Sequence, residues 1–188
     1  SQVLRYYQYP AGYNWANMPL QPDNSITLVE QQAIGGLCYD TAIAISTTFG
    51  PGGSSASVFN ADIAFVSYFG YSNSIRSSSP TVGTKFNNMV NPNLDSGRPA
   101  ILGISRTGSG HAVIADGYGY NSSTLYHHLN LGWNGNSTAW YALPAVNTSS
   151  YTYTNIEDCI YNVYMTGTGE IISGRVTDMG GNPIPGVT

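Results

Sequence analysis

The sequence changes character at Gly97-Arg98-Pro99, and this change constrains the fold more than any other feature. After it, short segments rich in β-branched, aromatic or alternating residues are separated by Gly, Asn and Ser, as in antiparallel strands. These segments predict strands near residues 100–104, 111–115, 125–131, 138–142 and 159–165. The part before it has a helical pattern. Helices followed by antiparallel strands predict an α+β domain, with the helices packed on one side of an antiparallel sheet.

Three helices are predicted in the first half of the chain. Thr27 and Glu30 stand three residues apart ahead of an apolar pattern, so that each side chain can satisfy a free backbone amide at a helix start. This signal predicts a helix over about 28–45, and apolar spacing predicts further helices near 57–68 and 84–94. The buried stripe of the helix near 57–68 is expected to include Val58, Ile63, Val66 and Phe69.

The composition is polar but carries little charge. Of the 188 residues, 41% are hydrophobic and 9% are charged, against about 25% charged in typical domains. Such a surface is common in exported proteins, so a secreted, extracellular location is predicted, with any export signal removed or upstream of Ser1. The net charge of −4, with six scattered basic residues, argues against nucleic acid or an anionic membrane as a partner. No apolar run approaches the ~20 residues of a membrane helix.

The two cysteines, Cys38 and Cys159, allow at most one disulfide. Each has apolar neighbours, which favours buried core thiols, although a bridge between them stays open for an oxidising compartment. The sequence has no Cys-x-x-Cys pair and no closely spaced His/Cys cluster. It therefore predicts no metal and no cofactor.

His111 is the strongest candidate for a catalytic group. It follows Thr107-Gly108-Ser109-Gly110, where missing side chains leave room for a substrate backbone, and it opens an otherwise apolar strand. Asn130 lies 19 residues later, in the predicted neighbouring strand. A carboxamide there can accept the ring N–H, which fixes the tautomer and the orientation of the imidazole. The alternative for His111 is an ordinary structural histidine.

Two further histidines and a tryptophan lie close to Asn130 in the sequence. His127 and His128 point to opposite faces of their strand, so at most one faces the core, and both are interpreted as structural. Trp133 either shields the bond between His111 and Asn130 from water or anchors the core after a turn.

Cys38 is a minor alternative as a nucleophile. It precedes His111 and Asn130, in the Cys, His, Asn order of papain-type proteases. A thiol at a helix N-terminus has a lowered pKa, as this catalysis requires. Thr27, however, places Cys38 eleven residues after the helix start, where the influence of the helix dipole has faded.

Several segments stand out together along the chain: residues 1–10, Tyr13-Asn14-Trp15, the loop 49–55, Gly110-His111-Ala112, the segment 130–135 and the strand 139–143. In the same order and with similar gaps, they resemble the streptopain family of papain-fold cysteine peptidases, which are secreted mainly by bacteria as zymogens. The resemblance runs from Ser1 to about Met165. It implies a papain-like fold, incomplete at its N-terminus, with a peptidase domain over residues 1–166.

The resemblance also implies the roles of single residues. The nucleophilic cysteine is expected just upstream of Ser1, so that this stretch alone is inactive, with His111 as the base and Asn130 in the segment that orients it. Family members often carry Trp directly after that Asn, where this chain has Leu131, so that shielding falls to Trp133. The partners implied are a polypeptide substrate and a propeptide, or another chain that supplies the missing N-terminal segment.

Two loops with little side-chain bulk are expected to bind an extended peptide. They contain Gly52 and Gly53 in the loop 49–55, and Gly110 in the segment 107–110.

The C-terminal residues 167–188 are predicted to be a linker and the first strands of a second, truncated domain. They resemble the opening hairpin of the carboxypeptidase-regulatory-like β-sandwich of secreted bacterial proteins. So short a segment cannot bury a core of its own, so it frays, lies on its own domain or pairs with another chain by strand addition.

Two functions of different class are therefore open. The first is a cysteine endopeptidase of streptopain type, which acts on extended peptides. The alternative is a non-catalytic structural, assembly or binding module on a degenerate peptidase fold, which uses the C-terminal strand for strand addition. A cysteine in the six or so residues before Ser1 favours the enzyme.

Overall fold

The computed structural model describes residues 1–173, 176, 178–180 and 184. The helices are α1 (Gln2–Tyr7), the short 3-10 helix η1 (Trp15–Asn17), α2 (Leu28–Ala44), α3 (Phe59–Ser67) and α4 (Thr84–Asp95). The strands are β1 (Asn73–Ser78), β2 (Ala100–Arg106), β3 (Ser109–Asn121), β4 (Thr124–Asn130), β5 (Ala139–Tyr141), β6 (Val146–Asn147), β7 (Thr152–Tyr153) and β8 (Asn155–Tyr164). The chain is therefore α+β, as the sequence predicts.

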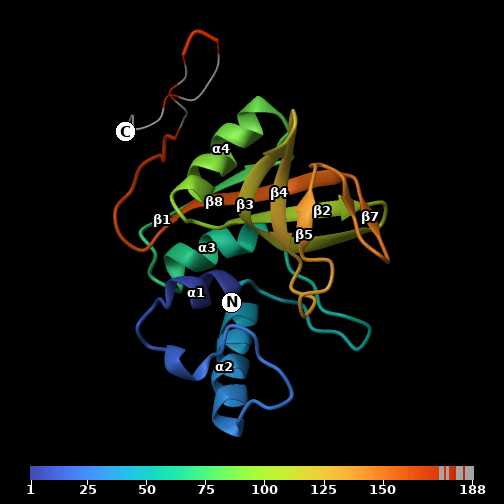
Figure 1. The fold of residues 1–188 in the computed structure, drawn as a ribbon. Helices are drawn as coiled ribbons and strands as arrows, with labels where there is room; N and C mark the ends of the chain where they lie inside the picture. Colours follow the sequence, from blue (N-terminus) through green and yellow to red (C-terminus); the bar gives the residue numbers. More distant parts are fainter. Residues whose placement is uncertain (174–175, 177, 181–183, 185–188) are drawn as a thin grey trace.

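Six strands form one antiparallel sheet in the order β1-β8-β2-β3-β4-β5 (Figure 1). The short strands β6 and β7 form a separate two-stranded sheet. The last strand, β8, lies between β1 and β2, so the sheet is complete only when the end of the domain is in place. The five predicted strands are all present. The strands β1, β6 and β7 were not predicted.

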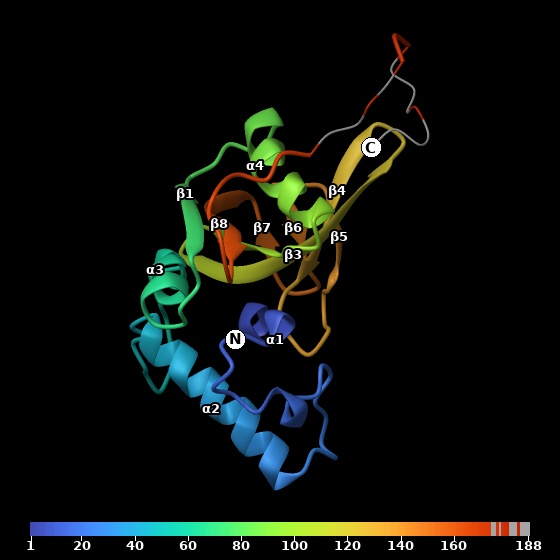
Figure 2. The ribbon, with the colours of Figure 1, turned by 90° about the vertical axis from the view of Figure 1, so that its left-hand side faces the viewer.

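The sheet buries one core on each face, because strand side chains alternate in direction. On one face, Leu102 of β2 and Val113 of β3 pack with Phe86 and Val90 of α4. On the other face, the neighbouring strand positions pack with α1, α2 and α3, and this core includes Val3, Leu4, Leu37, Phe65, Ile101, Ile114 and Ile160. Figures 1 and 2 show α4 on the opposite side of the sheet from α1, α2 and α3. The prediction of helices on a single side is therefore wrong for α4.

The start of α2 is the predicted capping box. The Oγ1 atom of Thr27 accepts a hydrogen bond from the backbone N–H of Glu30, and the Glu30 carboxylate accepts one from the N–H of Thr27 at 2.7 Å. These two bonds satisfy amides that have no partner within the helix. They fix the first residue of α2 at Leu28, as predicted.

The buried stripe of α3 differs from the prediction. Phe69 is buried, but Ile63 and Val66 are 49% and 45% exposed. The inner face of the helix instead carries Ala64 and Phe65. Since successive helical residues are about 100° apart, the positions on either side of this pair turn toward solvent.

Both cysteines are free thiols. Cys159 is buried, as predicted, and burial raises the pKa of its thiol to about 12. Cys38 is exposed, so the prediction of a buried core thiol is wrong there. Cys38 lies about 100° around α2 from the buried Leu37 and lines an open cleft, which explains the difference.

The chain after β8 makes polar contacts with β8 and with the end of α4. Glu170 accepts a hydrogen bond from Asn162, and the hydroxyl of Ser173 donates to Asp95. The backbone N–H of Ile184 donates a hydrogen bond to the carbonyl of Val176 at 3.0 Å, and the hairpin itself stays a prediction. The other positions of the predicted hairpin, 174–175, 177, 181–183 and 185–188, lie outside the described residues.

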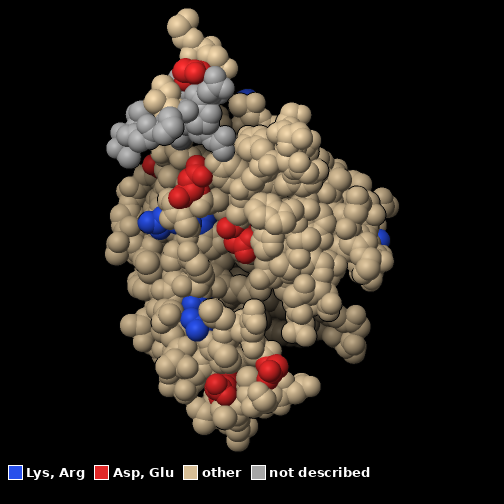
Figure 3. Space-filling model, in the orientation of Figure 1, with Lys and Arg blue, Asp and Glu red and all other residues tan. Residues whose placement is uncertain are grey.

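Charged side chains are few and scattered on the face that Figure 3 shows. Within the part of the chain that the structure describes, no helix is both long and apolar enough to cross a bilayer.

Candidate active site

His111 lies near the start of β3, opposite Ile104 of β2. The tight turn between these strands contains Gly108, whose φ of 76° is in the left-handed region that favours glycine. The imidazole is half-buried. The turn thus places His111 at the rim of the sheet, in contact with both protein and solvent.

One ring nitrogen of His111 is held by the backbone. Its Nε2 lies 2.7 Å from the carbonyl oxygen of Leu131. Because a carbonyl oxygen can only accept, Nε2 carries the hydrogen and donates it. In the neutral ring Nδ1 is then unprotonated, and Nδ1 is the nitrogen that can take up a proton.

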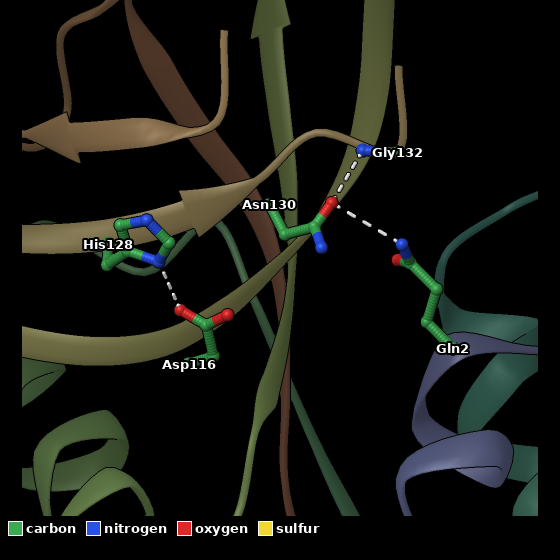
Figure 4. Close-up of polar contacts among 5 residues, drawn as sticks. All are labelled: Gln2, Asp116, His128, Asn130 and Gly132. Atoms are coloured by element: carbon green, nitrogen blue, oxygen red, sulfur yellow. Dashed lines mark hydrogen bonds and ion pairs between the residues drawn. The ribbon is translucent and has the colours of Figure 1, made fainter. Parts of the chain in front are cut away.

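Asn130 contacts other groups than the imidazole (Figure 4). Its Oδ1 accepts hydrogen bonds from the backbone N–H of Gly132 at 2.9 Å and from Nε2 of Gln2 at 3.4 Å. Asn130 pairs with Ile114, three residues beyond His111 and therefore on the other face of β3. The predicted hydrogen bond between His111 and Asn130 is thus replaced by one to Leu131.

The contact from Asn130 to Gly132 closes a local turn around Leu131. This turn fixes the peptide that presents the Leu131 carbonyl to His111. Since Leu131 acts through its main chain, the absence of a Trp side chain at this position leaves the contact to the ring intact.

Trp133 packs directly on the imidazole. The ring centroids of His111 and Trp133 are 4.8 Å apart, with 32° between the ring planes. The indole is partly buried against the core beside α4. It covers one face of His111, which limits the access of water to the ring.

The His111 ring borders a largely apolar cleft of about 510 Å³. Ser1 and Gln2 at the start of α1, Cys38 of α2, and Leu131 also line this cleft. The imidazole and the first residues of the chain therefore face the same space.

A second groove, of about 600 Å³, continues past His111. It lies between residues 54–58 and the strand segment that contains Gly110 and Ala112, and it also contacts Glu157 and Asp158. Gly110 thus lines a groove beside the candidate base. Gly52 and Gly53 lie nearer the tip of their loop and line neither space, so their role in binding stays a prediction.

Cys38 lines the cleft, yet its sulfur contacts a different group from the imidazole. Its Sγ lies 3.8 Å from the hydroxyl oxygen of Ser1. Cys38 is also far along α2, three turns after its N-terminus, where a helix no longer stabilises a thiolate.

The other two histidines have separate partners. His127 is 1% exposed, and its Nε2 lies 2.8 Å from the carboxamide oxygen of Asn91. Burial lowers the pKa of His127 to about 4. His128 lies on the opposite face, where its Nδ1 contacts Asp116 at 2.6 Å (Figure 4).

Sequence reasoning missed four groups at the site. They are the Leu131 carbonyl, Gln2, Glu157 and Asp158. The first had a local signal, because an Asn two residues before a Gly is typical of a turn closed by the Asn side chain. The others come from distant segments and depend on the sheet order. Among the described residues, no three His, Cys, Asp or Glu side chains gather as metal ligands.

The peptidase C10 family pattern matches residues 1–141. Streptopain of Streptococcus pyogenes is 28% identical over 141 residues, which are 73% of this chain and 34% of streptopain. The thiol protease/hemagglutinin PrtT of Porphyromonas gingivalis is 27% identical over 140 residues, 73% of this chain and 16% of that protein. The chain spans about a third of the length of streptopain and less of PrtT.

Solved structures of cysteine proteases also match this chain. Active wild-type interpain A, a cysteine protease of Prevotella intermedia, matches with a TM-score of 0.76 and 25% identity, over 86% of this chain and 79% of interpain A. A prointerpain A fragment matches in fold with a TM-score of 0.73 and 24% identity, over 88% of this chain and 61% of the fragment. The papain-like fold is therefore confirmed. Since the family pattern covers most of its length, the chain belongs to the peptidase C10 family.

Proposed function

We propose that this chain is the part of a cysteine endopeptidase that supplies the catalytic base, His111, and binds an extended polypeptide substrate. The observation that carries the proposal is the fixed tautomer of His111. Its Nε2–H is held by the Leu131 carbonyl and its face is covered by Trp133, so Nδ1 is left as the base at a cleft.

The nucleophile in this proposal is a cysteine within the six or so residues that precede Ser1 in the full-length protein. Ser1 lines the same cleft as His111, so the residues before it are within reach of the ring. Membership in the peptidase C10 family, with relatives named as thiol and cysteine proteases, supports a cysteine as the nucleophile. Cys38 is assigned no part in the chemistry.

The reaction follows from these groups. His111 Nδ1 takes the proton of the thiol, and the resulting thiolate attacks the peptide carbonyl carbon to form a C–S bond. Hydrogen-bond donors near the nucleophile stabilise the oxyanion. The imidazolium then protonates the leaving amine as the C–N bond breaks. Finally, His111 activates a water that hydrolyses the thioester.

Asn130 is a positioning residue in this scheme. Through its bond to the Gly132 N–H it holds the peptide of Leu131, whose carbonyl orients the ring. Trp133 protects the oriented imidazole from water.

The proposal extends to the setting of the enzyme. A peptidase domain over residues 1–166, secretion to the extracellular space and a propeptide as partner all agree with membership in this family. The prointerpain A fragment, by its name a proenzyme, supports the last point.

The test uses the full-length protein and an irreversible inhibitor that labels thiol proteases. We expect one cysteine before Ser1 to be labelled, with the loss of peptide hydrolysis. The His111→Ala variant should lose both labelling and hydrolysis, whereas Cys38→Ser should keep both. Labelling of Cys38 in the wild type, or full hydrolysis by His111→Ala, would contradict the proposal.

A further inference from the structure

We infer that the groove beside His111 binds a positively charged side chain of the substrate, a Lys or an Arg, with Asp158 as its principal partner. This inference rests on the proposed peptidase function and adds the substrate class. The groove is the space of about 600 Å³ bordered by residues 54–58, Gly110, His111, Glu157 and Asp158.

The floor of the groove is a row of residues across neighbouring strands. Asp158 of β8 pairs with Gly103 of β2, and Gly103 pairs with Ala112 of β3. Adjacent strands are about 5 Å apart, so the row extends about 10 Å from Ala112 to Asp158. Ala112 is the residue directly after His111. The acidic end of the floor is therefore two strand spacings from the strand that carries the candidate base.

Gly103 gives the Asp158 carboxylate its place in the groove. A Cβ atom at Gly103 would lie 3.0 Å from Oδ2 of Asp158 and 3.3 Å from a methyl carbon of Val58. These distances are shorter than ordinary contacts, so a larger residue would displace the Asp158 side chain. Because Gly103 has no side chain, the Asp158 carboxylate can lie over it and the floor of the groove beside it stays open.

The charge of the groove has one sign. Glu157 and Asp158 are its acidic residues, and no Lys or Arg lines it. The ion pairs among the described residues join Arg76 to Asp62 and His128 to Asp116, so neither groove carboxylate has a cationic partner. Burial, and secondarily Glu157, raise the pKa of Asp158. A carboxylate in this situation gains stability when a cation enters.

The dimensions of the groove fit a long cationic side chain. Lysine carries its ammonium on a flexible four-carbon stem, and arginine carries a planar guanidinium that can bind a carboxylate with two hydrogen bonds. A substrate residue above Ala112 would lay its apolar stem over Gly103, beside Val58. Its charged end would then reach Asp158.

The experiment compares matched peptides on the full-length protein. Fluorogenic peptides carry Lys or the uncharged, nearly isosteric norleucine at each position flanking the cleaved bond. At one position we expect the wild type to prefer Lys in kcat/KM by roughly two- to fivefold, the size of a partly exposed charge pair. Asp158→Asn should abolish this preference, and Glu157→Gln should reduce it.

Asp40→Asn is the matched control, because it removes one carboxylate charge from a position on α2 that lines neither the cleft nor the groove, and it retains an acceptor for Tyr13. It should keep the full preference. A wild type that cleaves Lys and norleucine peptides equally at every position would overturn the inference.

Binding of the same peptides to the His111→Ala variant separates this inference from the proposed function. A preference for the Lys peptide in binding, without turnover by the wild type, would support the groove and contradict the peptidase. Equal binding of both peptides would overturn the groove, whether or not the wild type cleaves them.

Discussion

His111 and His127 lie on neighbouring strands of one sheet, in opposite surroundings. His111 is half-buried at the rim, and only a backbone carbonyl and the Trp133 ring hold it. His127 is fully buried under α4, where it forms a hydrogen bond to Asn91. Its ring packs edge-on against Phe86, with 5.8 Å between the ring centroids. Burial lowers the pKa of His127 to about 4, so its ring is neutral under ordinary conditions.

The difference shows what a catalytic imidazole needs beyond a hydrogen-bond partner. Both rings donate from Nε2, to a carbonyl in one case and to a carboxamide oxygen in the other. Only His111 borders a cleft through which a nucleophile and a substrate can reach it. The same sheet therefore buries one histidine in its core and presents the other, the base of the proposed mechanism, at a cleft.

The largest expected effect separates the two histidines by activity. In the full-length protein, His111→Ala should reduce kcat/KM for peptide hydrolysis by a factor of about 10²–10⁴ or more, because the general base is lost. Thermal unfolding should change little, since the ring lies at the rim. His127→Gln should show the reverse pattern, with lower stability and nearly normal turnover per folded molecule. Equal losses of activity in the two folded variants would break the comparison.

The second prediction concerns stability and pH. The unfolded chain protonates His127 near pH 6.5, whereas the folded chain does so only near pH 4. The unfolded state therefore binds more protons between these values, and His127 should lower the free energy of unfolding by about 3 kcal/mol as the pH falls from 6.5 to 4. Denaturant unfolding of this chain at several pH values measures the slope.

The matched variants for this measurement are His127→Gln and His128→Gln. The first should flatten the slope, and the second, at a half-buried position on the other face of β4, should retain most of it. A slope that survives His127→Gln would place its origin in other groups.

The fold was predictable where local chemistry determines it. The capping box at Thr27 fixes the start of α2, and the Gly-flanked apolar segments form β2, β3 and β4. The prediction that α4 covers the same side of the sheet as the other helices was wrong. That side depends on how β1 and β8, which are far apart in the sequence, join the sheet. The segment β1, Asn73–Ser78, is mostly polar and half-exposed, so it lacks the apolar alternation of a strand.

The role of His111 as the base stays a prediction, and the predicted hydrogen bond between His111 and Asn130 was wrong. Glycines before an isolated histidine pointed to His111. Residue types indicate which side chains can bind the His111 ring, and Asn130 is such a residue. Every residue has a main-chain carbonyl, so the sequence does not single out that of Leu131. The strand register places Asn130 opposite Ile114, on the other face from His111, and this register was not available from residue spacing alone.

The third prediction tests the hydrogen bonds that link Asn130, the Leu131 peptide and the His111 ring. Asn130→Ala removes the acceptor for the Gly132 N–H, which loosens the Leu131 carbonyl, and should lower kcat by about tenfold with little change in KM. Asn130→Asp keeps an acceptor oxygen and should lose less. The proton position on the His111 ring, read from nitrogen chemical shifts, should become mixed in Asn130→Ala only. An unchanged proton position on the His111 ring in Asn130→Ala would show that Asn130 is merely structural.

The smallest effect is expected at Trp133, and it sharpens the contrast with the buried ring of His127. A Trp133→Phe variant keeps an aromatic face against His111, so kcat/KM should fall less than threefold. Trp133→Ala exposes that face and removes an aromatic contact of about 1 kcal/mol, which corresponds to about fivefold. Because water then reaches the imidazole, the loss should appear in kcat and in the rate of inhibitor labelling. If Trp133→Ala lowers only thermal stability, the indole acts as a core anchor, in the way that Phe86 does beside His127.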